Sequence, residues 1–136
     1  MAILVKMNMD TKYLGLLEAS QQIGEHQLDP HVLLAQCDEL ANQLEPHLKA
    51  FVSRNTLEHL QNSITPGPLS GIPIGIKDII DIAGQKTTCH SNIMLEHRAN
   101  EDAQVIRKLR AAGVIFMGKL ALHEFAIGGP AFDLPF

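Results

Sequence analysis

Lys77 is the residue of this sequence best suited to chemistry. It stands near the end of GPLSGIPIGIKDIID, residues 67–81, where a Gly- and Pro-rich turn leads into a short apolar strand. An ammonium group is costly to bury, so a lysine in so apolar a run is expected to be paired or held neutral. A neutral lysine can accept a proton, which makes Lys77 a candidate base. Taken alone, Lys77 could also be a strand-end lysine that reaches water.

Several other side chains belong to types that bind metals, but their spacing does not indicate a metal site. His90 and His97 lie seven positions apart, and His123 and Glu124 are adjacent. Neither spacing is typical of ligands, with or without the neighbouring Cys89, so we expect solvated or loop histidines and no metal.

Two acidic residues and a glycine pattern near Lys77 have ordinary explanations. Asp78 and Asp81 could form a carboxylate pair, but we expect them to flank a turn and to balance Lys77 or Lys86. The segment GIPIGIK lacks the Lys-Ser/Thr ending of a phosphate-binding loop. We therefore expect no cofactor.

Two amphipathic helices are predicted in the first half of the chain. The first starts at Asp10, which can cap a helix, and stops at Gly24. The second starts at Asp29 and Pro30, and Pro46 should end or kink it near residue 45. Its apolar positions recur at steps of three and four: Leu33, Cys37, Leu40, Ala41 and Leu44. Together the two helices should form a hairpin that serves as scaffold.

The second half of the chain predicts a strand–helix–strand unit. Residues 72–76 and 114–117 are apolar runs typical of buried strands, and residues 100–113 form the helix between them. Asn100 should cap this helix, with Glu101 and Asp102 in its first turn and Gly113 closing it. Its buried face should comprise Val105, Ile106, Leu109 and Ala112. A crossover of this length favours parallel strands.

Four shorter segments complete the expected elements. Residues 50–53 form a weak strand candidate, and residues 56–60 could be a helical turn or two. Residues 87–92 are polar and are predicted as a loop. Residues 120–125 are predicted as a short helix.

Composition and charge limit the classes of protein that this chain could represent. Its 136 residues suggest one domain, and its net charge of −4, with no basic stripe, argues against a nucleic-acid partner. No apolar run approaches the length of a membrane span, so no membrane partner is expected. Cys37 and Cys89 are far apart in sequence and indicate free thiols in a reducing cytoplasm.

The motifs around Lys77 together resemble one family. GPLSGIPIGIKD, the pair Thr87–Thr88, DAQVIRKLRAAG, VIFMGK and HEFAIGG follow the order and spacing of the amidase signature family. The similarity is strong from residue 67 to residue 129 and only compositional before that. The tail GGPAFDLPF is more similar to general bacterial amidases than to the tRNA-dependent amidotransferase subunit.

This resemblance implies a fold and a reaction. The fold class would be α/β: the N-terminal part of an amidase signature fold, with a helical hairpin followed by a strand–helix–strand unit of a mixed sheet. The reaction would be hydrolysis of an amide C–N bond by a Ser–cis-Ser–Lys triad, with Lys77 as the matching lysine and a small-molecule amide as substrate. Residues 1–136 would be a single partial domain, with residues 1–62 a mainly helical lead-in and residues 67–136 the start of the core.

The sequence departs from the family pattern at the serines of the triad. Family members carry both in a Gly/Ser-rich segment, and none of the five serines here lies in such a segment: Ser20, Ser53, Ser63, Ser70 and Ser91. The chain also ends on the apolar stretch Leu-Pro-Phe, which we interpret as a truncation. We therefore expect the chain alone to be inactive and its partner to be a complementing chain or a second copy of itself. The alternative interpretation is a non-catalytic structural or interaction module derived from an amidase.

Overall fold

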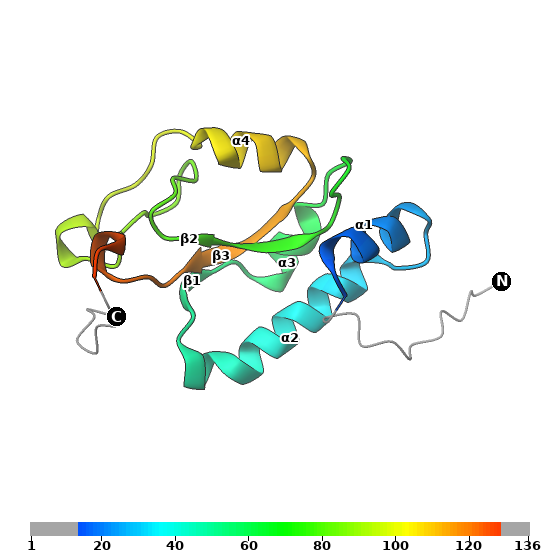
Figure 1. Ribbon diagram of the computed structural model, residues 1–136, viewed down its shortest axis with the longest axis horizontal. Helices are drawn as coiled ribbons and strands as arrows, with labels where there is room; N and C mark the ends of the chain where they lie inside the picture. The colour runs from blue at the N-terminus through cyan, green and yellow to red at the C-terminus, as the bar shows by residue number, and fades with distance from the viewer. Residues whose placement is uncertain (1–13, 129–136) are drawn as a thin grey trace.

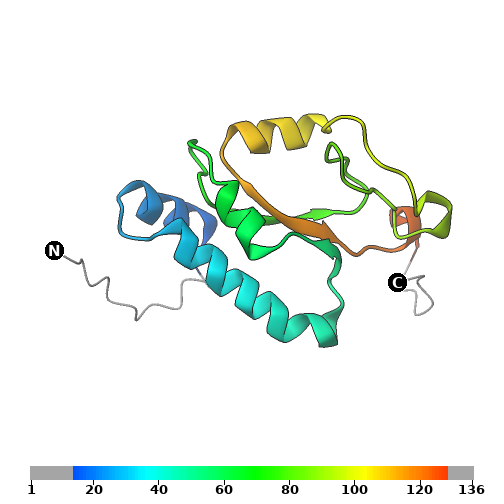
Figure 2. The ribbon, with the colours of Figure 1, turned by 180° about the vertical axis from the view of Figure 1, so that it is seen from behind.

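A mixed three-stranded sheet lies between helices in the computed structural model, which describes residues 14–128 (Figure 1). Helix α4 covers one face of the sheet, and helices α2 and α3 lie on the other, as the view from behind also shows (Figure 2). This arrangement confirms the predicted α/β class with a mixed sheet.

Helices α1 (Leu16–Gly24) and α2 (Pro30–Leu48) form the expected helical pair. They pack through a cluster that contains Ala19, Leu28 and Leu33. Asp29 caps α2 as predicted, because its Oδ1 accepts a hydrogen bond from His31 N at 2.8 Å. The proposed cap of α1, Asp10, lies outside the described residues, and the N-cap of α1 is Gly15.

The predicted end of α2 near residue 45 was wrong. The helix continues through Pro46 to Leu48 and ends at Lys49, whose φ is 46° and whose N–H bonds to Glu45 O at 2.9 Å. A proline in the last turn removes one backbone hydrogen bond and leaves the earlier turns intact. Leu44, which was assigned to the buried face, is 42% exposed.

Strand β3 (Ile115–Leu120) is central in the sheet, whose strand order is β1-β3-β2. Strand β2 (Pro73–Lys77) pairs with β3 in parallel, as predicted from the crossover. Strand β1 (Phe51–Arg54) pairs with β3 antiparallel, so the weak strand candidate does form a strand. Strand β3 is longer than expected and includes Lys119 and Leu120.

Helix α3 (Leu57–Asn62) and helix α4 (Gln104–Ala111) also form where helical structure was expected. The start of α4 differs, since its N-cap is Ala103 and neither Asn100 nor Asp102 caps it. On the predicted buried face, Ile106 is fully buried but Val105 is 45% exposed.

Within residues 14–128, two short 3-10 helices complete the elements: η2 (Asn92–Met94) and η3 (Glu124–Ala126). The helix predicted over residues 120–125 was wrong. Leu120 ends β3, and only the single turn η3 follows.

The two faces of β3 contact separate apolar clusters. Phe116 packs with Ile76 of β2 and Ile106 of α4. On the other face, Ile115 and Met117 pack in a cluster whose helical members are Leu34 of α2 and Leu60 of α3. Packing on both faces holds β3 rigidly, so the residues at its C-terminal end have a fixed position.

Candidate active site

The C-terminal ends of the parallel strands β2 and β3 bring two lysines to one edge of the sheet. Lys77 is the last residue of β2 and lies opposite Leu120 in the β3 register, next to Lys119. The Lys77 side chain is exposed, whereas Lys119 is 0% exposed. A lysine in an apolar run was expected to be buried and paired, and this holds for Lys119 and not for Lys77. Lys119 also stands in an apolar run, VIFMGKL, so the same rule could have pointed to it.

Lys77 is exposed because of its position in the strand alternation. Ile74 and Ile76 pack against the cluster beneath α4. Alternation along a strand turns Lys77 to the other face. Its backbone is nonetheless tightly held, because Lys77 O accepts hydrogen bonds from Ile79 N at 2.8 Å and Ile80 N at 3.0 Å.

Asp78 and Lys119 form a fully buried ion pair. Lys119 Nζ lies 3.0 Å from Asp78 Oδ1, and both side chains are 0% exposed. The prediction that Asp78 balances Lys77 or Lys86 was wrong, since Lys86 pairs instead with Glu96 at 2.9 Å. Asp78 Oδ1 has no hydrogen bond of good geometry within residues 14–128, so the charge of Lys119 compensates its burial.

The loop after residue 86 supplies the remaining partners of this pair. Thr88 donates to Asp78 Oδ2 from its backbone N at 3.0 Å and also from its hydroxyl. Thr87 Oγ1 accepts from Lys119 Nζ at 2.9 Å. Residues 87–91 are a loop, as predicted, and Asn92 begins η2. All five loop residues are buried, and the side chains of Thr87 and Thr88 complete this polar network.

His90 lies in this loop, as one of the two expectations had it, but it is buried and not solvated. It is 3% exposed, and its Nδ1 lies 2.7 Å from Leu122 O. The neighbouring Ser91 donates to Glu124 Oε1 at 2.6 Å, which ties this loop to η3. Within the part of the chain that the structure describes, no three His, Cys, Asp or Glu residues are grouped so as to hold a metal ion.

The Cys89 thiol is poorly suited to act as a nucleophile. Burial raises its pKa, and the charges of Asp78 and Asp81 raise it further, against the opposing effect of Lys119. A raised pKa favours the thiol over the reactive thiolate.

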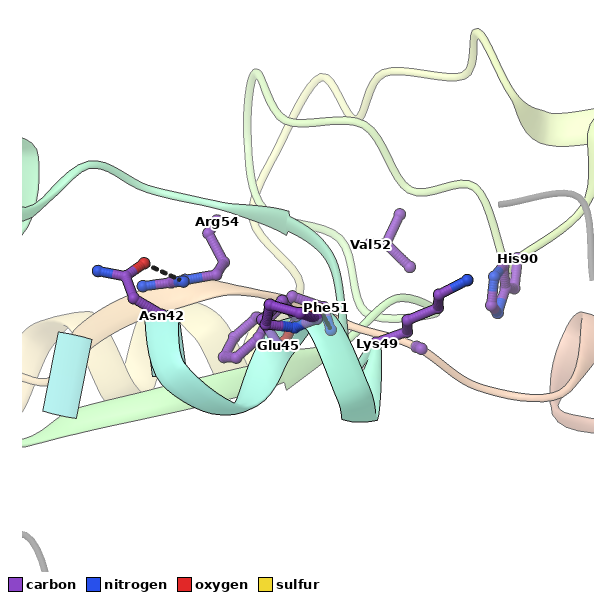
Figure 3. Close-up of a pocket in the computed structure, with 9 residues that line it drawn as sticks. Asn42, Glu45, Lys49, Phe51, Val52, Arg54 and His90 are labelled. Carbon is purple, nitrogen blue, oxygen red and sulfur yellow. Dashed lines mark hydrogen bonds between the residues drawn. The ribbon is translucent and has the colours of Figure 1, made fainter. Parts of the chain in front are cut away.

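A cavity of about 540 Å³ opens beside β1, away from the Lys77 side chain. Figure 3 shows Lys49 reaching from the end of α2 toward His90. Arg54, on the opposite side, donates to Asn42 Oδ1 at 2.8 Å. Lys77 is not among the lining residues, so this cavity is not the site in which that lysine would act.

A match to a known protein family accompanies this fold. The Amidase family model matches residues 33–131. The chain therefore belongs to the amidase signature family, and the resemblance identified from the motifs is confirmed.

Known relatives support this membership over most of the chain. The A subunit of glutamyl-tRNA(Gln) amidotransferase from Carboxydothermus hydrogenoformans is 32% identical over 130 residues, which cover 88% of this chain and 27% of that protein. The crystal structure of the corresponding subunit from Thermotoga maritima superposes with a TM-score of 0.72 at 34% identity, covering 89% of this chain and 25% of that one. Native peptide amidase from Stenotrophomonas maltophilia superposes with a TM-score of 0.70 at 26% identity, covering 83% of this chain and 26% of that one.

Two further findings follow from these comparisons. The chain spans about a quarter of the length of these relatives (27% of the first). The tail that suggested a general amidase lies mostly outside the described residues. The curated relative above is an amidotransferase subunit, which does not support that finer assignment.

Among residues 14–128, no helix is long and apolar enough to cross a membrane.

Proposed function

We propose that this chain contributes the base of an amide-hydrolysing active site, and that the base is Lys77. Family membership supports the reaction class, which is cleavage of an amide C–N bond. We choose Lys77 because it differs from Lys119 in burial and in pairing. Lys119 is fully buried in an ion pair, whereas Lys77 is exposed, and no described residue pairs with its ammonium.

The proposed chemistry needs two serines from outside residues 1–136. Lys77, when neutral, would take a proton from a bridging serine, which would in turn activate the nucleophilic serine. Backbone N–H groups of the Gly/Ser-rich segment that carries these serines would stabilise the oxyanion. The proposal requires no metal or cofactor.

The proposal also covers the segment that would complete the site, the substrate, and the compartment in which the chain would act. Residues 1–136 would act as one partial domain, and the serines would reach it on a complementing segment, in the same chain or another. The substrate would be a small-molecule amide. The two free thiols, Cys37 and Cys89, favour a reducing cytoplasm.

The first prediction tests where the serine nucleophile lies. The purified chain of residues 1–136 should not hydrolyse aliphatic or aryl amides above background, and a fluorophosphonate probe should label none of its serines. The measurements are product release and mass spectrometry of the treated protein. A probe-labelled serine within residues 1–136, with loss of turnover, would show that the nucleophile had been misplaced.

The second prediction tests Lys77 directly. The chain is mixed with the part of the Thermotoga maritima amidotransferase subunit that follows the matched region, and amide hydrolysis is measured. Lys77→Met should lower kcat by about 10⁴-fold or more, because a triad without its base loses most of its rate. The control is Lys108→Met, an exposed lysine of α4. Equal activity of the two variants would rule out Lys77 as the base.

A further inference from the structure

The buried ion pair next to Lys77 is enclosed by polar atoms of the loop after residue 86. The three protons of the Lys119 ammonium face three oxygens: Asp78 Oδ1 at 3.0 Å, Thr87 Oγ1 at 2.9 Å and Lys86 O at 3.2 Å. Asp78 Oδ2 accepts from both the N–H and the hydroxyl of Thr88. The Lys119 ammonium therefore has no proton left for a substrate. Asp78 Oδ1, which lacks a hydrogen bond of good geometry among the described residues, is fully buried beside that ammonium.

Stability alone does not account for so costly an arrangement. Removing two charges from water is expensive, and well-packed apolar residues often replace a buried ion pair without loss of stability. Such a pair can instead fix one specific local geometry. The backbone hydrogen bonds of Asp78 indicate which local geometry this pair fixes.

The backbone of Asp78 is anchored to the same two segments as its side chain. Asp78 N donates to Leu120 O at 2.9 Å, and Asp78 O accepts from Cys89 N at 2.9 Å. Asp78 is therefore bound to the end of β3 and to the loop of residues 87–89 through both backbone and side chain. This fixes the point at which the chain leaves β2, one residue after Lys77.

We propose that Asp78 and Lys119, with Thr88, are positioning residues that hold Lys77 in the orientation its role as a base requires. The β2–β3 ladder fixes Lys77 on one side and the anchored Asp78 on the other, so only its side-chain torsions remain free. The network touches the Lys77 backbone neighbours and not its ammonium. This inference rests on the proposed function of Lys77.

The test separates a positioning role from a purely structural one by observing Lys77 itself. Lysines carrying ¹³C at Cε are introduced into the chain, and Lys77→Arg identifies the Lys77 signal. The main variant is Asp78→Leu with Lys119→Met, which removes both charges at similar volume. The matched control is Asp102→Asn with Arg110→Met, which removes an ion pair at α4.

The double variant should fold, with a shifted and broadened Lys77 signal. Amide hydrogen exchange at position 78 and at Cys89 should rise by at least about tenfold, the equivalent of losing one ordinary hydrogen bond. The control pair should leave the Lys77 signal and both exchange rates unchanged. A folded double variant with an unchanged Lys77 signal would overturn the proposal, as would a control that moves the signal equally.

Thr88→Val decides the outcome if the double variant does not fold. This variant keeps both charges and removes only the hydroxyl that donates to Asp78. A changed Lys77 signal in folded Thr88→Val would support positioning, and an unchanged signal would overturn it. None of these measurements uses amide turnover, so a failure of the proposed function would be recognised separately in the activity assays.

Discussion

At the scale of single residues, Gly118 governs how closely β1 approaches β3. A Cβ built on Gly118 would lie 2.2 Å from the backbone O of Ser53 and 2.9 Å from Arg54 Cα. Both atoms belong to the backbone of β1, which cannot move aside as a flexible side chain could. Any larger residue must therefore push the two strands apart.

Gly118→Ala should accordingly destabilise the chain by about 1–3 kcal/mol, the usual cost of overpacking. Gly24→Ala is the matched control, because no atom lies within 4 Å of the position that its added methyl group would occupy, and it ends α1. The control should be neutral or stabilising by up to about 1 kcal/mol. Urea denaturation of both variants measures the difference, and equal stabilities would contradict the steric explanation.

The individual residues of the site were only partly predictable from sequence. A rule based on apolar surroundings singles out lysines in buried strands, and it applies equally to Lys77 and Lys119. It cannot tell which of them faces the core, because that depends on strand register and on the position of β3 between two other strands. The partners of Asp78 were missed for the same reason, since Thr88 and Lys119 meet it only in the folded sheet.

At the scale of secondary-structure elements, Asp102 fixes the segment that leads into α4. It does not cap the helix; its Oδ1 accepts from Ala83 N at 2.8 Å, and its Oδ2 accepts from Arg110 Nε at 2.9 Å. The hydrogen bond from Arg110 lowers the pKa of Asp102, and the Ala83 hydrogen bond lowers it further, while burial opposes both.

This lowered pKa predicts an acid-dependent contribution to stability. A carboxyl whose pKa is lower in the folded state stabilises the fold fully above its ordinary pKa of 3.8, and this contribution disappears as the pH falls through the lowered value. Asp102→Asn should therefore melt below the unmodified chain at pH 7 and approach it near pH 2. Thermal melts across this range test the prediction against the exposed control Glu101→Gln. A constant difference between Asp102→Asn and the unmodified chain would contradict it.

The elements themselves followed the sequence closely where hydrophobic periodicity was strong. Helix α2 and the parallel strands β2 and β3 formed as predicted, because their apolar spacing had one clear solution. Errors at element ends include residues 46–48 of α2, which continue the helix past its predicted end. There a single hydrogen bond or a tertiary partner, as for Asp102, outweighs local preference.

At the scale of the whole molecule, large apolar side chains remain on the described surface. Leu17 is 81% exposed, Ile93 82% and Ile127 79%. The outer edges of β1 and β2 also have no further strand within residues 14–128. Exposed apolar groups and open sheet edges are the features through which chains associate.

The chain of residues 1–136 should therefore self-associate as its concentration rises. Leu17→Gln combined with Ile93→Asn should weaken this association without lowering the melting temperature, because neither side chain contributes to the buried clusters. Sedimentation velocity at several concentrations measures the association, and Glu58→Gln, an exposed polar position, is the control. A chain that stays monomeric at every concentration would show that these apolar groups are tolerated in water. An unchanged association in the double variant would instead indicate that the strand edges drive it.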